Sequence, residues 1–294
     1  LAQGARGIVL GDIDPQEILR LIETKRISYA FLVPAVILFL TQQPNVRQID
    51  FSSLKNISYG ASPIAQDLLL AAKDIMGCEF LQVYGLTETT GGGTVLPPED
   101  HDPARGKLRS CGKPSPGHEV RVVDAQGRSL PPGEVGEIVI RAPNVMKGYW
   151  NRPEATEKSI VDKWFYTGDA GYFDEDGYLY IHDRVKDMIV SGGENIYPAE
   201  VENAIFGHPA VADVAVIGVP DEKWGEAVKA VVVKKPGAEA DPAAIIAWAR
   251  ERIAGYKLPK SVDFIEALPR NPTGKILRRE LRKPYWEGRD RQVN

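Results

Sequence analysis

Short apolar runs rich in aromatic and β-branched residues predict β-strands in the first third of the chain. They cover residues 28–33, 56–59 and 79–84, and each ends at a turn-forming residue. Strands separated by helices favour a parallel sheet, because parallel neighbours need a crossover connection. Ligands bind such sheets at the carboxyl ends of the strands, so we expect the loops at Gly60 and Gly85 side by side on one edge.

Helix signals fill the intervals between these strands. The run D-P-Q-E at 14–17 supplies an N-cap, a first-turn proline and a capping-box acid for a helix that is predicted to end near Glu23. Ser62 is the predicted N-cap of a second helix, with Pro63 in its first position, and Gly77 is predicted to end it.

The pattern changes between Gly106 and Asp183, where short alternating strands are separated by tight turns. Residues 119–123 and 136–141 are two such strands, and this arrangement predicts a small antiparallel sheet or barrel. The run D-E-D-G at 174–177 resembles the start of a calcium loop. The positions after it lack the acids that such a loop needs, so we predict a hairpin turn.

Beyond Asp183 the pattern changes again, with strands at 212–219 and 227–234 and helices that begin at Pro198 and Asp241. Strands grouped apart from helices indicate a compact α+β module. The whole pattern predicts an α/β protein in three parts. We expect a partial parallel-sheet α/β part over residues 1–105, a small antiparallel β-barrel-like part over 106–185 and an α+β domain over 186–294.

The composition indicates sizeable cores and no basic block. A length of 294 residues suits about two domains of ordinary size, and a hydrophobic content of 43% is enough to build their cores. A net charge of -4 argues against nucleic acid as a partner. Two cysteines without metal-ligand spacing fit a reducing, cytoplasmic location. The longest apolar run, 31–40, is too short for a transmembrane segment, so we predict a core or pocket wall.

Polar and small residues follow the predicted strands at the places where ligands bind. Gly60, Ala61 and Ser62 are small enough to let a flat ring approach the backbone. Thr87 and Glu88 offer a hydroxyl and a carboxylate suited to phosphate and Mg²⁺. Each loop alone is an ordinary turn, but two such loops on one edge predict a nucleotide site.

Two further residues have both a functional and a structural interpretation. Asp169, in T-G-D, could accept hydrogen bonds from ribose hydroxyls or could be an aspartate in a turn. Lys275 follows the turn-forming run P-T-G and precedes a helix predicted over 276–281. Its ammonium group could stabilise charge on a phosphate or carboxylate, or could be a solvated surface group.

Five motifs occur along the chain in one order: Y-G-L-T-E at 84–88, T-G-D at 167–169, D-R-V-K-D at 183–187, S-G-G-E-N-I-Y-P at 191–198 and P-T-G-K at 272–275. Supporting runs are G-A-S-P at 60–63, G-Y-W-N-R-P-E-A-T at 148–156 and P-D-E-K-W-G-E at 220–226. With them the chain resembles the adenylate-forming enzymes, which include acyl-CoA synthetases, nonribosomal-peptide adenylation domains and luciferases. The resemblance covers essentially the whole chain and is greatest to bacterial fatty-acyl-CoA synthetases.

The resemblance implies a two-step ligase reaction that uses ATP, Mg²⁺ and CoA. A small-molecule carboxylic acid attacks the α-phosphate of ATP to give acyl-AMP and pyrophosphate, and the CoA thiol then takes the acyl group and releases AMP. The residues that it assigns to the nucleotide are Gly60, Ala61, Ser62 and Tyr84 at the adenine, with Gly85 as a further cofactor-binding residue, Thr87 at the phosphate, Glu88 at Mg²⁺, and Asp169 with Arg184 at the ribose.

The resemblance also gives the C-terminal domain a mobile role. Lys275 corresponds to the lysine that bridges the acyl carboxylate and the α-phosphate during adenylation, and a fixed cation suits that task. Lys186 matches the hinge about which the domain rotates between the half-reactions. Gly192 and Gly193 match the segment that lines the pantetheine tunnel, and Asn195 is grouped with them as cofactor-binding.

The chain departs from the family at one motif, because a Ser/Thr/Gly-rich phosphate loop that ends in a lysine is absent from it. The run T-T-G-G-G-T at 89–94 has no lysine after it. We therefore expect the chain to be the C-terminal part of a longer ligase, with the N-terminal half of that protein as its partner. Alone, the chain is expected not to form acyl-AMP. A homo-oligomer is compatible with the sequence.

Several interpretations of the activity stay open. The run S-G-G-E-N at 191–195 favours a CoA ligase over an adenylation domain that loads a carrier protein, and luciferase chemistry is a less favoured alternative. A non-catalytic nucleotide-binding module is the alternative from another class. The glycines at 91–93 leave room in the expected acyl pocket, which favours a fatty acid over an aryl acid.

Overall fold

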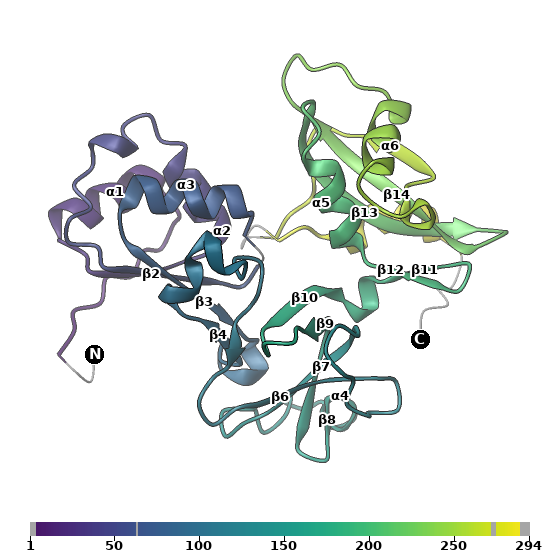
Figure 1. The fold of residues 1–294 in the computed structure, drawn as a ribbon, viewed down its shortest axis with the longest axis horizontal. Helices are drawn as coiled ribbons and strands as arrows, with labels where there is room; N and C mark the ends of the chain where they lie inside the picture. The colour runs from purple at the N-terminus through teal and green to yellow at the C-terminus, as the bar shows by residue number, and fades with distance from the viewer. Residues whose placement is uncertain (1–3, 63, 272–274, 289–294) are drawn as a thin grey trace. The chain divides into compact units, whose positions relative to one another are not determined.

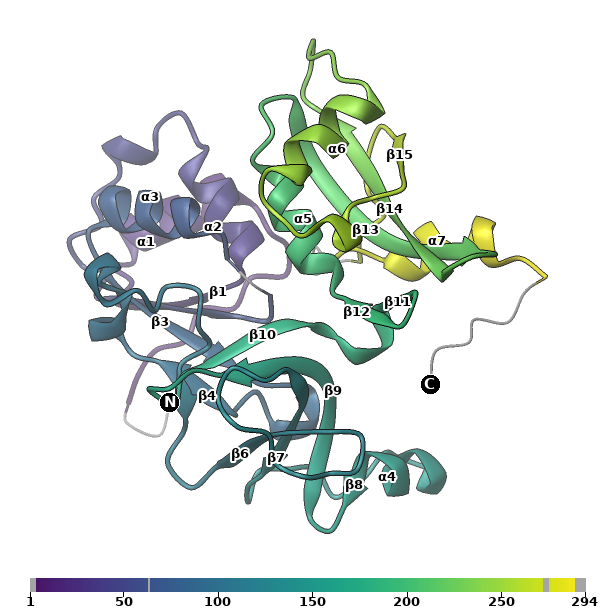
Figure 2. The ribbon, with the colours of Figure 1, turned by 45° about the vertical axis from the view of Figure 1, so that its right-hand side comes forward.

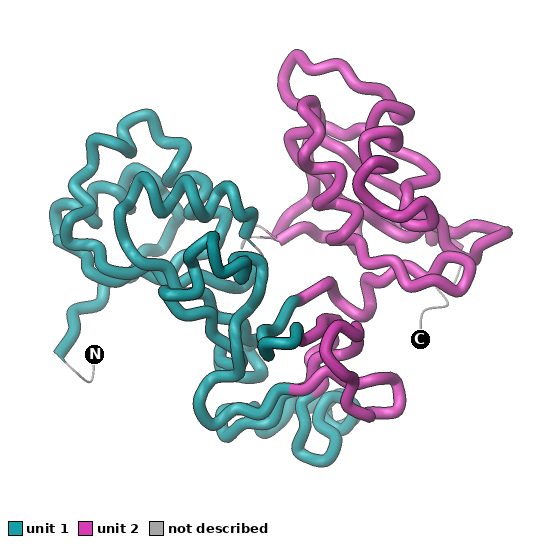
Figure 3. Tube along the Cα trace, in the orientation of Figure 1, with its two compact units in different colours: residues 1–120, 140–165, 174–180 teal, residues 121–139, 166–173, 181–294 magenta. Residues whose placement is uncertain are grey.

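The computed structural model describes residues 4–62, 64–271 and 275–288 of the chain (Figures 1 and 2). The chain separates into two compact units (Figure 3). Unit 1 comprises residues 1–120, 140–165 and 174–180, and unit 2 comprises residues 121–139, 166–173 and 181–294. Among the described residues, no helix combines the length and the apolar character that a membrane crossing requires.

Unit 1 contains the sheet that the first apolar runs predict. Strands β1 (Tyr29–Leu32), β2 (Asn56–Gly60) and β3 (Glu79–Tyr84) are parallel neighbours. The antiparallel strands β4 (Thr94–Leu96) and β5 (Lys113–Pro114) extend the sheet in the order β1-β2-β3-β4-β5. The predicted parallel sheet is therefore confirmed, and the carboxyl ends of β2 and β3 lie next to each other.

Three helices lie over this sheet: α1 (Pro15–Thr24), α2 (Pro34–Thr41) and α3 (Gln66–Met76). Figures 1 and 2 show them together over β1–β3. The core beneath them includes Leu19, Ile37, Tyr59 and Phe80, and burial of such a side chain contributes about 1.5–3 kcal/mol. The apolar run 31–40 thus supplies core residues through α2, whereas Phe31 on β1 is 66% exposed.

The ends of α1 and α3 confirm most of the capping signals. Asp14 accepts hydrogen bonds from the backbone N–H groups of Gln16 and Glu17 at 2.9 and 3.3 Å, as an N-cap residue does. The Glu17 side chain pairs with Arg20 at 2.6 Å instead of closing a capping box. Gly77 ends α3 with a φ of 58°, in the left-handed region that glycine adopts readily.

The start of α3 corrects one prediction. Ser62 is not its N-cap, because the helix begins at Gln66 and Ala65 occupies the cap position without a side-chain hydrogen bond. Ala61 has a φ of 68°, so the chain turns sharply after β2 before helical geometry begins. Pro63, the predicted first helical residue, lies outside the described residues.

Short strands from the middle of the chain form a second sheet, in the order β10 (Leu179–Arg184), β9 (Trp164–Phe173), β7 (Gly136–Arg141) and β6 (Glu119–Val123). Strand β8 (Ile160–Val161) pairs with β9 and follows helix α4 (Pro153–Ser159). Over the described residues this sheet stays open, with β10 and β6 at its ends. Of the predicted sheet and the predicted barrel-like form, the open sheet is the one found.

The D-E-D-G run forms the predicted hairpin turn between β9 and β10. Asp174 accepts hydrogen bonds from the backbone N–H groups of Asp176 and Tyr178 at 3.0 and 2.8 Å. The Lys107 ammonium group pairs with Asp174 and Asp176 at 2.8 and 2.6 Å, so a lysine neutralises these carboxylates. Nowhere in the described parts of the chain do three His, Cys, Asp or Glu side chains gather to hold a metal ion.

Unit 2 contains the predicted α+β module. Its sheet has the order β12 (Glu194–Ile196), β11 (Ile189–Ser191), β14 (Gly225–Lys234) and β13 (Val211–Asp221), and β15 (Ser261–Phe264) runs parallel to β14. Its helices are α5 (Pro198–Phe206), α6 (Pro242–Arg250) and α7 (Arg278–Trp286). Single-turn 3-10 helices elsewhere are Val46–Gln48, η2 (Thr87–Thr89), Pro98–His101, Pro103–Arg105, η5 (Val185–Asp187) and Gly255–Lys257.

Helices pack on both faces of this third sheet. On one face α5 and α6 share a core with β13 and β14 that includes Val216 and Ile245. On the other face Leu281 and Tyr285 of α7 pack against Ile217. The helix predicted over 276–281 begins later, at Arg278, because the backbone of the preceding segment first forms an isolated bridge between residues 270 and 276.

Candidate functional site

The loops after β2 and β3 lie side by side in unit 1, and two glycines allow it. A Cβ atom on Gly60 would collide with the backbone oxygen of Val83 on the neighbouring strand. A Cβ atom on Gly85 would collide with the backbone of Gly91. The freedom that glycine gives at these two positions is therefore used for close approach of the chain to itself. Ala61, directly after β2, is exposed.

Thr87 and Glu88 lie in η2, directly after β3. Thr87 is exposed and Glu88 is half-buried. Glu88 Oε1 accepts a hydrogen bond from the hydroxyl of Tyr149 at 2.8 Å, and its backbone oxygen accepts one from the N–H of Met146 at 2.7 Å. The loop that contains Met146 and Tyr149 thus fixes both the backbone and the carboxylate of Glu88.

Asn144 and Tyr149 are site neighbours to which no motif assigned a role. Asn144 Nδ2 donates to the backbone oxygen of Thr89 at 2.6 Å, and Thr90 Oγ1 donates to the backbone oxygen of Asn144 at 3.0 Å. Tyr149 belongs to the supporting run at 148–156, which was the only signal available for it. A local pattern does not identify partners that lie more than fifty residues apart in the chain.

Two of the three glycines at 91–93 have close neighbours where the sequence suggested open space. A Cβ atom on Gly92 would lie 3.1 Å from Nδ2 of Asn144, and one on Gly93 would lie 2.9 Å from the backbone oxygen of Tyr84. Of the three, Gly91 alone has no atom within 4 Å of that position. The segment packs closely against Tyr84, so it gives no support for a fatty acid over an aryl acid.

Asp169 and Arg184 form an ion pair in unit 2, with 2.7 Å between Oδ1 and Nε and side chains that are 9% and 31% exposed. Asp169 lies inside β9 and not in a turn. Thr167 Oγ1 accepts a hydrogen bond from the N–H of Asp169 at 3.0 Å and donates one to the backbone oxygen of Ile138 at 2.7 Å. The T-G-D segment is therefore held rigidly by its own strand neighbours.

Lys275 lies before α7 and is exposed. The Lys275 N–H donates to Oδ1 of Asn271, and the Asn271 N–H donates to the backbone oxygen of Lys275, both at 2.9 Å. The predicted P-T-G turn at 272–274 lies outside the described residues. Partial loss of solvation, and then the charge of Arg184, lower the pKa of Lys275, while Asp169 opposes them. The ammonium group therefore lies within electrostatic reach of both partners of the ion pair.

The remaining predicted residues lie at η5 and at the turn between β11 and β12. Lys186 in η5 and Asn195 on β12 are exposed. Gly192 and Gly193 form the turn with φ values of 61° and 87°. A Cβ atom on Gly192 would lie 2.6 Å from the ring of Trp224, whereas one on Gly193 would have no atom within 4 Å. Trp224, in the run P-D-E-K-W-G-E, is a neighbour that the sequence did not single out.

The predicted residues thus form two sets. Those in unit 1 share the carboxyl ends of β2 and β3, and they are Gly60, Ala61, Ser62, Tyr84, Gly85, Thr87 and Glu88. Those in unit 2 lie on β9, β10, η5, the β11–β12 hairpin and the loop before α7, and they are Asp169, Arg184, Lys186, Gly192, Gly193, Asn195 and Lys275.

Comparison with known families matches two stretches of the chain. The family described as AMP-binding enzyme matches residues 1–150, which are 150 of the 294 residues. The chain belongs to the AMP-binding enzymes. The C-terminal domain of the AMP-binding enzymes matches residues 200–275 of the same chain.

Curated relatives of this AMP-binding enzyme are named for different acids. It is 46% identical over 274 residues to the fatty acid–[acyl-carrier-protein] ligase ScoC of Streptomyces coeruleorubidus, a match that covers 93% of this chain and 53% of that protein. It is also 46% identical over 285 residues to a feruloyl-CoA synthase of Amycolatopsis sp., with 97% and 57% covered. The chain therefore spans about half the length of these relatives.

Solved structures agree with the family. The ATP-bound crystal structure of MatB from Rhodopseudomonas palustris matches this AMP-binding enzyme with a TM-score of 0.86 and 37% sequence identity. The match covers 95% of this chain and 54% of that one. The predicted α/β fold class and the predicted resemblance to adenylate-forming enzymes are confirmed.

Proposed function

We propose that this AMP-binding enzyme is an AMP-forming acid–CoA ligase when it is part of a protein with the full length of its relatives. The enzyme activates a carboxylic acid with ATP as acyl-AMP and then transfers the acyl group to the thiol of CoA. The observation that carries the proposal is the group formed by Asp169, Arg184 and Lys275 in unit 2, where one carboxylate and two cations lie within electrostatic reach.

Lys275 supplies the positive charge for the adenylation step. Its ammonium group contacts the acid carboxylate and the α-phosphate together, which offsets their repulsion and the charge that builds on phosphorus as the new bond forms. Asp169 accepts hydrogen bonds from the ribose hydroxyls, and Arg184 holds that carboxylate in place through the 2.7 Å ion pair. Fixed positions matter here, because a preorganised charge needs no rearrangement during the reaction.

The unit 1 residues fit the rest of a magnesium nucleotide. Gly60, Ala61, Ser62 and Tyr84 are assigned to the adenine, with Gly85 beside them, Thr87 to the phosphates and Glu88 to Mg²⁺. One carboxylate is enough for this ion, since Mg²⁺ is commonly held by one or two carboxylates, waters and the substrate phosphates. The half-buried Glu88, fixed through Tyr149, offers a carboxylate of this kind. When bound, Mg²⁺ neutralises charge on the phosphates.

The second half-reaction uses the α+β module. Gly192, Gly193 and Asn195 are assigned to the pantetheine arm of CoA, and Lys186 to the hinge. This assignment keeps the three-part organisation with boundaries at 105 and 185, in which residues 186–294 form the mobile domain. Both glycines of this turn are exposed, and the absence of side chains suits a ligand that passes along its backbone.

The acid and the acyl acceptor have two candidates each. A fatty acid and an aryl acid are both represented among the relatives, and the close packing at Gly92 and Gly93 removes the argument that separated them. CoA is the proposed acceptor, because S-G-G-E-N at 191–195 is typical of CoA ligases. A carrier protein is the second candidate, since one relative at 46% identity is named as an acyl-carrier-protein ligase.

The test is a two-step assay of the full-length protein that contains this chain. ATP–pyrophosphate exchange is measured with fatty acids of several lengths and with benzoate, cinnamate and ferulate. Each active acid is then offered CoA or a holo-acyl-carrier protein, and thioester is quantified. We expect acid-dependent exchange and CoA thioester. Tight AMP binding without exchange on any acid would indicate a non-catalytic nucleotide-binding module instead.

A further inference from the structure

Five charged side chains form a largely buried cluster in unit 2 outside the proposed nucleotide contacts. Asp183 ends β10, Asp187 lies in η5, Glu202 is on α5, and Arg278 and Arg282 are on α7. Their side chains are between 5% and 15% exposed. Below, these five residues are called the Arg278 cluster.

Arg278 lies at the centre of the cluster. Its Nη2 is 2.7 Å from Oε2 of Glu202, and its Nη1 is 3.6 Å from Oδ1 of Asp183 and 3.9 Å from Oδ2 of Asp187. Arg282 pairs with Asp187 at 2.8 Å. Three carboxylates thus face two guanidinium groups, and removal of one cation from such a buried set leaves charge without compensation.

Asp183 lies on the other side of the proposed hinge from the rest of the cluster. It precedes Lys186, whereas Glu202 and Arg278 follow it. One Asp183 oxygen pairs with Arg278, and the other accepts a hydrogen bond at 2.9 Å from the N–H of Ala199 in the first turn of α5. Rotation of the module about Lys186 would break both contacts, so the cluster is specific to this orientation.

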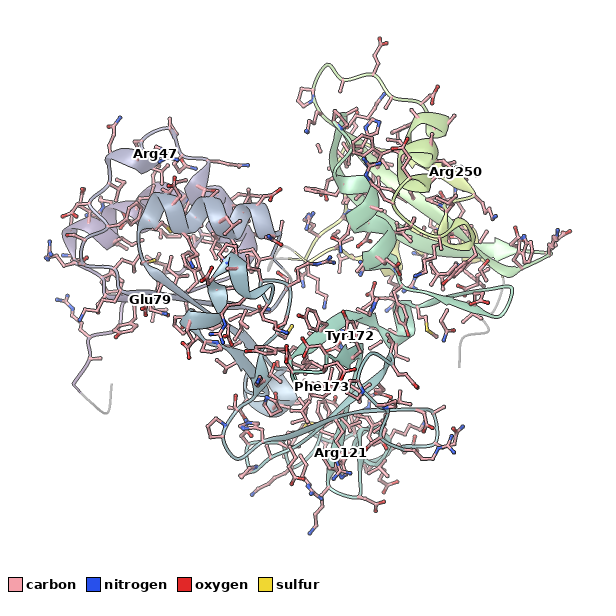
Figure 4. The ribbon with its side chains drawn as sticks, viewed as in Figure 1. Arg47, Glu79, Arg121, Tyr172, Phe173 and Arg250 are labelled. Carbon is pink, nitrogen blue, oxygen red and sulfur yellow. The ribbon has the colours of Figure 1, made fainter. Side chains whose placement is uncertain are left out.

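A group of aromatic rings crosses the same hinge. The ring of Tyr172, labelled in Figure 4, lies 5.6 Å from the ring of His182, which lies 4.9 Å from the ring of Tyr197. Tyr172 and His182 belong to β9 and β10, and Tyr197 precedes α5. These contacts accompany the Asp183 ion pair and depend on the same orientation.

Arg278 also lies close to Lys275 along the chain. It lies three residues after Lys275 in the chain, and Arg270 precedes the loop. Arg270 Nη2 pairs with Oδ2 of Asp213 on β13 at 2.5 Å. Arg270 is therefore fixed to β13, and Arg278 is fixed to α5 and to the end of β10.

We infer that Arg278 is a positioning residue for Lys275, and that its pair with Asp183 holds the module in the orientation in which Lys275 reaches Asp169 and Arg184. This inference rests on the proposed function. In that orientation the enzyme forms acyl-AMP, and release of Asp183 is a condition for the thioester step. Loss of the Arg278 contacts therefore lowers the rate of adenylation relative to the rate of thioester formation.

The first test compares Arg278→Met with Arg279→Met in the full-length enzyme. Arg279 is the exposed neighbour on the same helix and serves as the matched control. Acyl-AMP formation is measured by pyrophosphate exchange, and thioester formation is measured from supplied acyl-AMP and CoA. We expect the ratio of the two rates to fall by about 100-fold in Arg278→Met, as for a small displacement of a reacting group, and to stay unchanged in Arg279→Met.

Asp183→Asn is the decisive variant, because it keeps an oxygen for the Ala199 N–H and leaves the Arg278–Glu202 pair intact. We expect the rate ratio to fall by about tenfold, a typical coupling between distant sites. If Arg278→Met does not fold, the rate ratio of Asp183→Asn alone decides whether the inference holds. An unchanged ratio, or equal losses in both half-reactions, overturns the inference while the proposed function stands. A wild-type enzyme that forms no acyl-AMP overturns the proposed function itself.

Discussion

Lys275 is an exposed residue whose pKa is nevertheless lowered, first because its ammonium group loses part of its solvation and next because Arg184 repels it. A lysine whose pKa is lower in the folded protein than in the unfolded chain opposes folding while it is protonated. That cost falls as pH rises through the lowered pKa and vanishes above the ordinary lysine value. A group kept at such a cost in the folded state is a candidate for function.

Lys275→Met is therefore expected to separate activity from stability. Pyrophosphate exchange by the full-length enzyme should fall by about 100- to 1,000-fold, the usual loss when one charge-stabilising donor is removed. The free energy of unfolding at pH 7, measured with urea, should be unchanged or higher. In the wild type, exchange should decline as pH rises through the lowered pKa of Lys275. Loss of stability with normal exchange would assign Lys275 to the fold.

Gly192 and Gly193 offer a matched pair of substitutions. Both have positive φ, so alanine costs about 1 kcal/mol of backbone strain at either position. A Cβ atom at Gly192 also presses on the Trp224 ring, which adds about 1–3 kcal/mol of overpacking. Gly192→Ala should therefore lower the urea midpoint more than Gly193→Ala.

Both variants also test the proposed assignment of this turn to CoA. In Gly193→Ala the new Cβ atom enters the open space that the pantetheine arm is proposed to use, and in Gly192→Ala it displaces Trp224. Each variant should raise the KM for CoA in thioester formation, while exchange of pyrophosphate is spared. A wild-type KM for CoA in Gly193→Ala would remove this turn from the proposed CoA site.

At the scale of elements, the helices and strands that could be predicted are those whose signals lie within a few residues of them. β2 and β3 could be predicted because apolar composition and the glycine after each strand act within a few residues. The D-E-D-G turn could be predicted for the same reason. The start of α3 could not, because the φ of 68° at Ala61 sets the path of the chain after β2. Serine at 62 has the right chemistry for a cap but stands too early.

The capping of α1 and α3 gives a paired prediction on stability. Asp14→Ala removes the side chain that accepts from two backbone N–H groups and should cost about 1 kcal/mol. Ala65→Ser supplies a hydroxyl at the vacant cap of α3, where the backbone is already extended, and should gain a similar amount. Urea unfolding of the chain checks both, with Ala65→Gly as a control for backbone effects. A loss of stability in Ala65→Ser would show that the cap geometry is wrong.

At the scale of the whole molecule, the candidate site depends on partners far apart in the sequence. Glu88, Asp169 and Lys275 could be predicted from the motifs that contain them, because the order of those motifs along the chain is itself a pattern. They could not name Tyr149, which bonds Glu88 from 61 residues away, or Glu202, which binds Arg278 from 76 residues away. Such pairs follow from the packing of complete units, and a pattern read along one segment carries no information about them.

The absence of the lysine-ended phosphate loop from these 294 residues leads to the last prediction. The residues proposed to contact the nucleotide offer one hydroxyl and one carboxylate near the phosphates, Thr87 and Glu88, and both come from η2. Backbone N–H groups of a glycine-rich loop hold phosphates in many nucleotide sites, and the described residues that are proposed to contact the nucleotide include no such cradle. Without it the triphosphate is not aligned for attack, and alignment is a large part of the rate.

Purified alone, the 294-residue chain should therefore show no acid-dependent ATP–pyrophosphate exchange above a protein-free blank. The full-length enzyme, assayed at equal concentration with the same acid, is the positive control. Circular dichroism on the isolated chain establishes that it is folded, so that inactivity is not the result of unfolding. Asp169, Arg184 and Lys275 all lie in unit 2 of this chain. The Asp169–Arg184 ion pair and the lowered pKa of Lys275 should therefore be present in the isolated chain even though it is inactive. Exchange by the folded chain at a rate near that of the full-length enzyme would show that adenylation needs no phosphate loop of this kind.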